Sequence, residues 1–129
     1  MHPVIVSATF TWKDEADADA VASAHKALAD FALGVPGVRV CRYGLYETQR
    51  TSTVFGVYES TAVFKQVFDE LVTRGSDILE AERALTELVP DQTIIQGDKA
   101  SLDSIHEVIE AWGMKRFHTD TQGDGHVDI

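Results

Sequence analysis

Residues 38–71 read VRVCRYGLYETQRTSTVFGVYESTAVFKQVFDEL. The first part of this stretch is rich in β-branched and aromatic residues, and this composition predicts two strands, over residues 38–47 and 52–59. The link between them, residues 48–51, is short enough for a hairpin. We therefore expect the two strands to be antiparallel neighbours in one sheet.

The second part of the stretch has the period of a helix. Ser60 can accept a hydrogen bond from the first turn and so cap this helix. The apolar residues that then recur at helical spacing are Phe64, Val67, Phe68, Leu71 and Val72. Residues 74–76 (RGS) break the pattern, and a second helical piece is expected over residues 77–88, before Pro90.

Upstream of this stretch, residues 4–12 (VIVSATFTW) have the composition of a strand. A helix is expected from Asp14 to about Leu33, because an acidic first turn suits the positive end of the helix dipole. Gly34 and the following residues 36–37 (PG) end it. Its apolar stripe contains Ala18, Val21, Ala24, His25, Leu28 and Phe31.

Downstream, three more elements are expected: a short strand at residues 92–96, a helix from Ser101 to Trp112 that Gly113 closes, and a strand at residues 115–120. The resulting order is β-α-β-β-α-β followed by an additional α-β. The first six elements have the ferredoxin-like arrangement of an α+β protein.

The length of 129 residues fits a single domain. We divide the domain into a core at residues 4–96, a C-terminal extension at residues 97–120, and a polar tail at residues 121–129, which is expected to fray.

Composition and charge exclude several classes of function. The net charge is -10, and eleven Lys and Arg residues are scattered among twenty-one acidic ones, which argues against nucleic acid or an anionic membrane as a partner. Cys41 is the lone cysteine, so no internal disulfide and no thiolate zinc site can form. No signal peptide and no apolar run of about 20 residues is present, so a cytoplasmic location is expected.

The sequence also lacks the common motifs of cofactor chemistry. It contains no Gly-rich phosphate loop, no nucleophile elbow, no His-x-x-x-His pair and no Cys-x-x-Cys pair. We therefore expect neither a metal nor an organic cofactor.

The two central strands are apolar on both faces. In residues 38–47 one face carries Val38, Val40 and Tyr46, and the other carries Cys41, Tyr43 and Leu45. In residues 52–59 one face carries Phe55 and Val57, and the other carries Val54 and Tyr58. The helices of a ferredoxin-like chain cover only one face, and a bare apolar face is costly in water. We expect a homodimer through the second face; the alternative is that the C-terminal elements cover it within one chain.

Residues 38–71 resemble the antibiotic-biosynthesis monooxygenase-like domain of the dimeric α+β barrel superfamily. The matching features are Arg42-x-Gly44 in one strand, an aromatic strand that ends in Tyr58-Glu59-Ser60, and a helix that follows with Phe64. The element order over residues 4–96 agrees as well.

The resemblance implies a dimer with a cleft between sheet and helices in each subunit. Some members oxygenate phenolic or hydroquinone substrates without metal or flavin, because the substrate anion passes an electron to oxygen. Other members are lyases, isomerases, haem-degrading enzymes or proteins of unknown role. Many members carry a His nine residues after the strand Tyr, where this chain has Val67, a departure that weakens the transfer of a catalytic role.

Two residues are candidates for catalysis. His25 lies on the apolar stripe of its helix, should point toward the sheet, and could remove a phenolic proton; the alternative is a boundary histidine with a satisfied hydrogen bond. Arg42 lies within an apolar strand and could stabilise a bound phenolate or enolate; the alternative is a structural pair with an acid such as Glu47 or Glu59.

Four aromatic residues are candidates for binding a small aromatic ligand. Tyr43, Tyr46 and Tyr58 could line a pocket for a planar substrate and offer hydroxyl donors. Trp12 ends the first strand and could stack on a ligand. The alternative for the tyrosines is a role in the core, and for Trp12 the closure of one end of the barrel.

Three functions remain open at this stage. The first is cofactor-independent oxygenation of an aromatic or polyketide-like molecule. The second is a non-catalytic, small-ligand-binding or stress-associated barrel protein, which the aliphatic Val67 favours. The third is an isomerase or lyase that uses His25 as a proton shuttle.

Overall fold

The computed structural model describes residues 2–119 and 126–128. Its strands are β1 (Val4–Trp12), β2 (Val38–Tyr46), β3 (Thr51–Tyr58), β4 (Thr86–Leu88), β5 (Ile94–Gly97), β6 (Lys115–His118) and β7 (His126–Asp128). Its helices are α1 (Ala18–Leu33), α2 (Thr61–Thr73), α3 (Ser76–Leu85), α4 (Lys99–Asp103) and α5 (His106–Trp112). Short 3₁₀ turns lie at Glu47–Gln49 and Pro90–Gln92.

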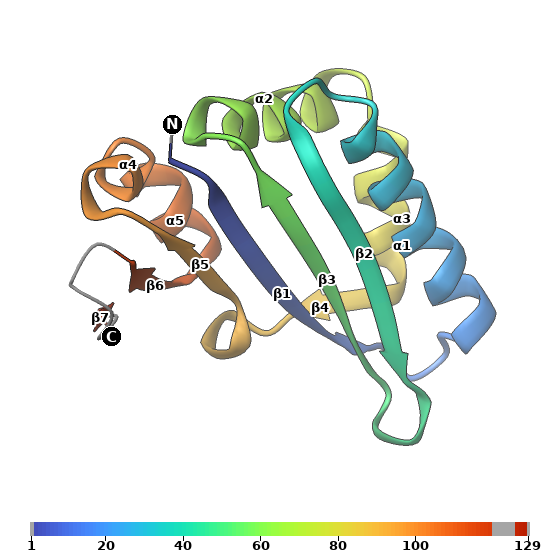
Figure 1. Cartoon of the computed structure of the whole chain (residues 1–129). Coiled ribbons are helices and arrows are strands. Elements are labelled where there is room, and N and C mark those ends of the chain that lie inside the picture. The colour runs from blue at the N-terminus through green and yellow to red at the C-terminus, as the bar shows by residue number, and fades with distance from the viewer. Residues whose placement is uncertain (1, 120–125, 129) are drawn as a thin grey trace.

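These strands form one mixed sheet in the order β2-β3-β1-β5-β6-β7 (Figure 1). The central strand β1 pairs antiparallel with β3 on one side and with both β4 and β5 on the other. The neighbours β2, β3, β1 and β5 are the four strands of a ferredoxin-like sheet, which confirms the predicted α+β fold and the predicted hairpin. The extension adds β6, which runs parallel to β5.

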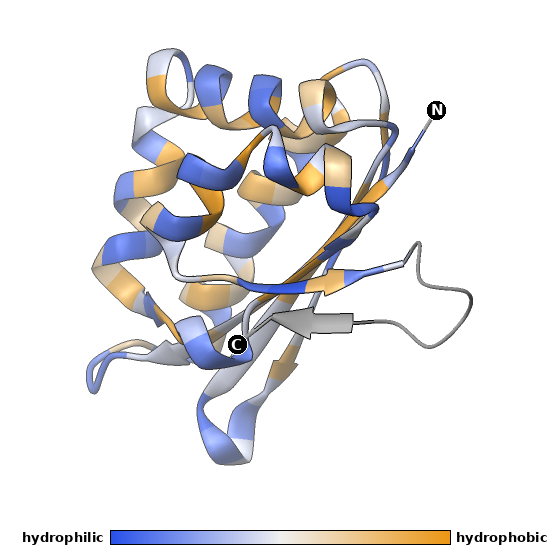
Figure 2. Cartoon of the chain, turned by 90° about the vertical axis from the view of Figure 1, so that its left-hand side faces the viewer, coloured by the Kyte–Doolittle hydropathy of each residue, from blue (hydrophilic) through white to orange (hydrophobic). Residues whose placement is uncertain are grey.

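The helices gather on one side of the strands (Figure 2). Asp17 caps α1 by accepting a hydrogen bond from the backbone N–H of Ala20 at 2.8 Å, and Ser60 caps α2 through the N–H of Val63 at 3.3 Å. Each long helix turns its apolar stripe toward the sheet. None of the described helices is both long and apolar enough to cross a membrane.

Three predicted elements differ in the structure. Residues 86–88 form β4 instead of the end of a helix, because they pair with residues 10–12 of β1. The helix expected from Ser101 to Trp112 is split into α4 and α5, with Ile105 between them. The tail contributes β7, which pairs with β6, while residues 120–125 and 129 lie outside the described residues.

The face of the sheet that is turned away from the helices is called the open face below. Its apolar side chains are Ile5, Val40, Phe55, Val57 and Ile94, and Arg42 and Ser7 lie opposite Phe55 on the two neighbouring strands. Phe55 and Ile94 are each 38% exposed. Figure 1 looks onto this face, and α4 and α5 do not cover it. Among the described residues, the alternative in which the C-terminal elements cover the second face is therefore wrong.

Candidate functional site

A cavity of about 420 Å³ lies between the sheet and the helices. Its size falls within the range of small-molecule sites, roughly 300–1,000 Å³. Most of the wall is apolar, and much of it is aromatic: the aromatic lining residues are Phe10, Tyr58, Phe64, Phe68 and Trp112. Such a wall suits a flat, largely apolar molecule.

Both the core and the extension build this wall. Phe64 and Phe68 project from α2, and their rings meet edge to face at a centroid distance of 4.8 Å. Trp112, at the end of α5, packs on Phe68 at 5.3 Å, and Met114 follows it on the wall. Val67 stands where many members of the family that residues 38–71 resemble carry a His. It also lines the cavity and is only 2% exposed.

Tyr58 places a hydroxyl group at this wall. Its side chain folds back over Gly56, where an added Cβ would lie 2.6 Å from the hydroxyl oxygen. Burial, and secondarily the neighbouring Cys41, raises the pKa of Tyr58. The residue is 7% exposed, and no side chain or backbone group of the described chain hydrogen-bonds its hydroxyl. A ligand oxygen in the cavity could therefore accept this hydrogen bond.

Four buried side chains, joined by hydrogen bonds and called the polar chain, lead to the same cavity: Trp12, Ser52, His25 and Glu82. His25 of α1 is completely buried, and its Nδ1 lies 2.7 Å from Oε1 of Glu82 of α3. The other ring nitrogen, Nε2, lies 2.6 Å from Oγ of Ser52 of β3. The indole N–H of Trp12 of β1 donates to the same Ser52 oxygen at 3.1 Å. Four elements thus converge on a chain in which every side chain is at most 8% exposed.

Glu82 is the member of this chain that reaches the cavity. It lines the wall, and it is 5% exposed. His25 does not line the cavity, but its imidazole packs against Phe10, which does, at a ring-centroid distance of 5.2 Å. A carboxylate at an apolar wall can accept a proton from a bound molecule.

Ser52, His25 and Glu82 have the hydrogen-bond order of a nucleophilic triad. The surroundings of the serine do not fit that chemistry. Ser52 is 1% exposed, is not part of the cavity wall, and already accepts a hydrogen bond from Trp12. A substrate carbonyl cannot approach its oxygen, so the arrangement does not support covalent catalysis by Ser52.

The structure brings three of the predicted site residues to this region. His25 points toward the sheet as expected, and Tyr58 lines the cavity. Trp12 belongs to the polar chain, with the guanidinium of Arg50 at 5.5 Å from its ring centre. Tyr43 lies beside His25 at a ring distance of 6.1 Å, but it is 36% exposed and is not part of the cavity wall.

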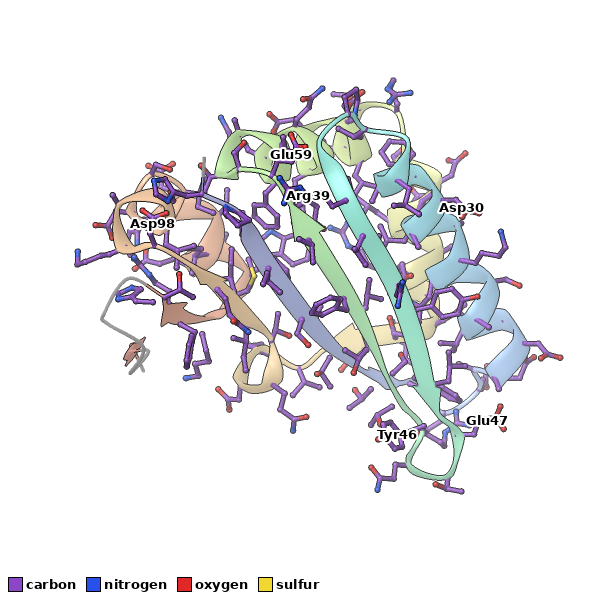
Figure 3. All side chains as sticks on the ribbon, in the orientation of Figure 1. Asp30, Arg39, Tyr46, Glu47, Glu59 and Asp98 are labelled. Atoms are coloured by element: carbon purple, nitrogen blue, oxygen red, sulfur yellow. The ribbon has the colours of Figure 1, made fainter. Side chains whose placement is uncertain are left out.

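Arg42 and Tyr46 lie elsewhere. Both belong to β2 on its open face, and Tyr46 is 66% exposed near the end of the hairpin (Figure 3). The expected ion pair of Arg42 with Glu47 or Glu59 is absent among the described residues: Glu59 lies instead 3.7 Å from Arg39, and the two are labelled side by side in Figure 3.

Sequence reasoning missed Glu82, Ser52 and Thr86. A signal for Glu82 was present, because it stands four residues after Ile78 and three after Leu79, in the apolar stripe of its helix. A charged residue at such a position faces the interior. Among the described residues, no group of three His, Cys, Asp or Glu side chains is close enough to hold a metal ion.

Comparison with known proteins gives matches in structure alone. No protein-family model matches the chain, and no curated protein matches it. MupZ from Pseudomonas fluorescens aligns with a TM-score of 0.76 at 11% identity, over 92% of this chain and 91% of that chain. SnoaB, a cofactor-independent oxygenase from Streptomyces nogalater, aligns with a TM-score of 0.61 at 16% identity, over 74% and 91%.

A Bacteroides thetaiotaomicron protein described as a possible oxidoreductase aligns with a TM-score of 0.59 at 12% identity, over 72% of this chain and 94% of that chain. The chain shares the fold of these proteins. The resemblance expected from residues 38–71 is thereby confirmed at the level of fold. The match to MupZ covers so much of the chain that it includes part of the extension after Gly97.

Proposed function

We propose that the protein binds a flat, largely apolar molecule of aromatic or polyketide-like structure in the cavity and oxygenates it without a cofactor, with Glu82 as the proton acceptor. The observation that carries this proposal is the buried carboxylate of Glu82 on a mostly apolar and partly aromatic wall, whose other charged residues, Lys13, Arg83 and Glu87, are exposed. The shared fold with a cofactor-independent oxygenase supports it. The hydroxyl of Tyr58 supplies a hydrogen bond to a substrate oxygen.

The proposed reaction consumes one dioxygen molecule for each phenol. Glu82 takes the proton of a phenolic hydroxyl, and the resulting anion passes one electron to dioxygen. The radical pair combines at a ring carbon that bears hydrogen, and the peroxide takes the proton back from Glu82. The hydroperoxide then loses water, with cleavage of its O–O bond, and leaves a quinone. The balance is one phenol and one O₂ to one quinone and one H₂O.

An oxygen electrode tests this proposal with phenols and hydroquinones of one to three fused rings. We expect uptake above the spontaneous rate for the wild type, with one oxygen atom of ¹⁸O₂ in the product. Glu82→Gln keeps the size of the side chain and should lower turnover by roughly 10² to 10⁴, the usual contribution of a general base. Glu80→Gln, on the same helix but exposed, is the matched control and should leave turnover unchanged.

Two results would reject the oxygenase proposal. One is equal uptake by the wild type and Glu82→Gln. The other is a product that lacks the ¹⁸O label. His25→Ala should also lower turnover, because it removes the hydrogen bond that holds Glu82, although His25 does not touch the cavity.

An isomerase or lyase is the second candidate, and the same geometry supports its first step. Removal of a proton by Glu82 need not be followed by reaction with oxygen. Under nitrogen in D₂O, such an enzyme would exchange a substrate C–H or convert the substrate, whereas an oxygenase would give no product. The anaerobic measurement therefore separates the two.

A non-catalytic ligand-binding protein is the third candidate. The aliphatic Val67 on the cavity wall favours it, since many members of the family that residues 38–71 resemble have a His at this position. If calorimetry shows that the protein binds aromatic compounds that it neither oxygenates nor deprotonates, the result would support this function over the other two.

We also propose that the protein is a cytoplasmic homodimer that pairs through the open face. The apolar residues of that face support pairing, because their burial against a second copy would remove them from water. The net charge of -10 continues to argue against nucleic acid as a partner.

A further inference from the structure

The polar chain from Trp12 to Glu82 has a direction that its hydrogen-bonding groups determine. An indole N–H can only donate, so Ser52 Oγ is an acceptor at its first contact, 3.1 Å from Trp12 Nε1. A serine hydroxyl has one hydrogen of its own. The remaining contact of Ser52 within the described chain is His25 Nε2 at 2.6 Å, so that hydrogen has one available acceptor.

The direction of the first two hydrogen bonds determines which nitrogen of the His25 ring carries the proton. If Nε2 accepts from Ser52, the ring proton of a neutral histidine lies on Nδ1, which then donates to Glu82 Oε1 at 2.7 Å. In the opposite direction, His25 would donate to Ser52, and the Ser52 hydrogen would have no acceptor among the described residues. A buried donor without an acceptor is costly, and the network avoids this cost in one direction alone.

Glu82 therefore stands at the accepting end of the chain. Its Oε1 is engaged by His25, and Thr86 Oγ1 lies 3.4 Å from Oε2. The single hydrogen of Thr86 goes to a closer acceptor, the backbone carbonyl of Glu82, at 2.8 Å. Lone pairs of Oε2 thus remain free on a side chain that lines the cavity.

We infer that Trp12, Ser52 and His25 are positioning residues that hold Glu82 as an ionised acceptor, and that Oε2 is the atom that takes the substrate proton. Each donor along the polar chain holds the next group in place, and the last hydrogen bond, from Nδ1 of His25 to Oε1 of Glu82, fixes the orientation of the carboxylate. This inference rests on the proposed function for the proton transfer, but the donor-to-acceptor direction of the hydrogen bonds in the polar chain is a property of the free protein.

Nitrogen NMR of the ¹⁵N-labelled wild-type protein at neutral pH tests the direction without a ligand. Long-range ¹H–¹⁵N correlations distinguish a protonated from a bare ring nitrogen, and His25→Gln identifies the signals of His25 by their loss. We expect Nδ1 to be protonated and Nε2 to be bare. A ring with its proton on Nε2, or on both nitrogens, would overturn the inference.

Substitution of Ser52 tests the positioning role. Ser52→Ala removes the donor to Nε2, and we expect a mixture of ring tautomers and a fall in kcat of about tenfold or more, with KM unchanged, as part of the general-base factor. Ser52→Thr keeps the hydroxyl and should restore both properties, and Ser7→Ala on the open face is the matched control. An unchanged tautomer and unchanged kcat in folded Ser52→Ala would overturn the positioning role.

The two proposals fail in different ways. If the wild type shows the Nδ1–H form and no compound is turned over, the direction of the chain stands and the oxygenase proposal falls. If turnover depends on Glu82 while Nε2 carries the proton, the oxygenase proposal stands and the positioning chain falls.

Discussion

The two faces of β3 have opposite roles in the molecule. Ser52, Val54 and Tyr58 point toward the helices and are at most 8% exposed. Phe55 and Val57, which alternate with them, lie on the open face, where Phe55 is 38% exposed. Successive side chains of a strand point to opposite sides, so one short strand contributes to the candidate small-molecule site on one face and to the proposed dimer contact on the other.

The open face is itself divided along the strands. Toward the hairpin, β1 and β3 present small polar side chains on it, namely Thr9, Thr11, Thr51 and Thr53. Farther along, the apolar pair Ile5 and Val57 lies at opposed positions of β1 and β3. The covered face is divided the same way, since Ser52 and the polar chain lie at the hairpin end and the aromatic wall lies beyond. The contrast between the faces is therefore one of exposure more than of composition.

The largest expected difference between the two faces is in the free energy of unfolding that a substitution on each face costs. Phe64 is completely buried on the covered side, and Phe64→Ala should cost about 3–5 kcal/mol. Phe55→Ala, on the open face, should cost about 1 kcal/mol or less in the monomer. Urea denaturation at low protein concentration, where dimer formation adds little, measures both values. Equal losses would mean that the two faces are equally buried in solution.

A smaller but distinctive effect is expected on the state of association. The wild type should have a mass near twice 14.2 kDa by light scattering coupled to size exclusion. Phe55→Lys places a charge in the apolar part of the open face and should yield the monomer mass. Val72→Lys, at a 67% exposed apolar position on α2, is the matched control and should keep the dimer. A wild-type monomer at micromolar concentration would contradict pairing through this face.

The smallest effect concerns the thiol of Cys41, which lies on the covered face. Burial raises its pKa from 9.0 to about 11. We expect iodoacetamide to label the native protein slowly at pH 8 and the urea-unfolded protein readily. Thr53→Cys in a Cys41→Ser background places a thiol on the open face and should react faster. Equal rates for the two native proteins would contradict the difference in burial.

The same thiol predicts a change of stability with pH. Above pH 9 the unfolded chain loses the thiol proton, whereas the folded chain keeps it to about pH 11. The unfolded state then binds fewer protons than the folded state, so the contribution of Cys41 is present below pH 9 and decreases between pH 9 and 11. Cys41→Ser should remove this part of the pH dependence in urea titrations.

Much of the fold could be predicted because local patterns determine it. The β-branched and aromatic composition of residues 38–59 and the helical period after Ser60 give β2, β3 and α2 with nearly the observed bounds. β4 could not be predicted in this way. Residues 86–88 continue the helical pattern of α3, and their pairing with β1 depends on contacts between residues far apart in the chain.

The site was predictable in part for a related reason. The apolar stripe of α1 indicated that His25 faces inward, but its hydrogen-bond partners come from two other elements, and no local pattern shows that Ser52 and Glu82 meet it. Arg42 illustrates a second limit of the prediction, which concerns the choice of face. The alternation of β2 places it with Val40 and Tyr46, but with both faces apolar the sequence does not reveal which of them the helices cover.

The place of β1 in the sheet has a consequence during synthesis. All of its partners follow it in the chain, since β3 begins at Thr51 and β5 ends at Gly97. The apolar stretch at residues 4–12 therefore emerges from the ribosome well before any strand that can pair with it. Unpaired strand edges and exposed apolar residues promote aggregation of nascent chains. Slow translation of residues 13–50 would lengthen this interval, so expression yield should depend on translation speed in that segment and on chaperones that bind early.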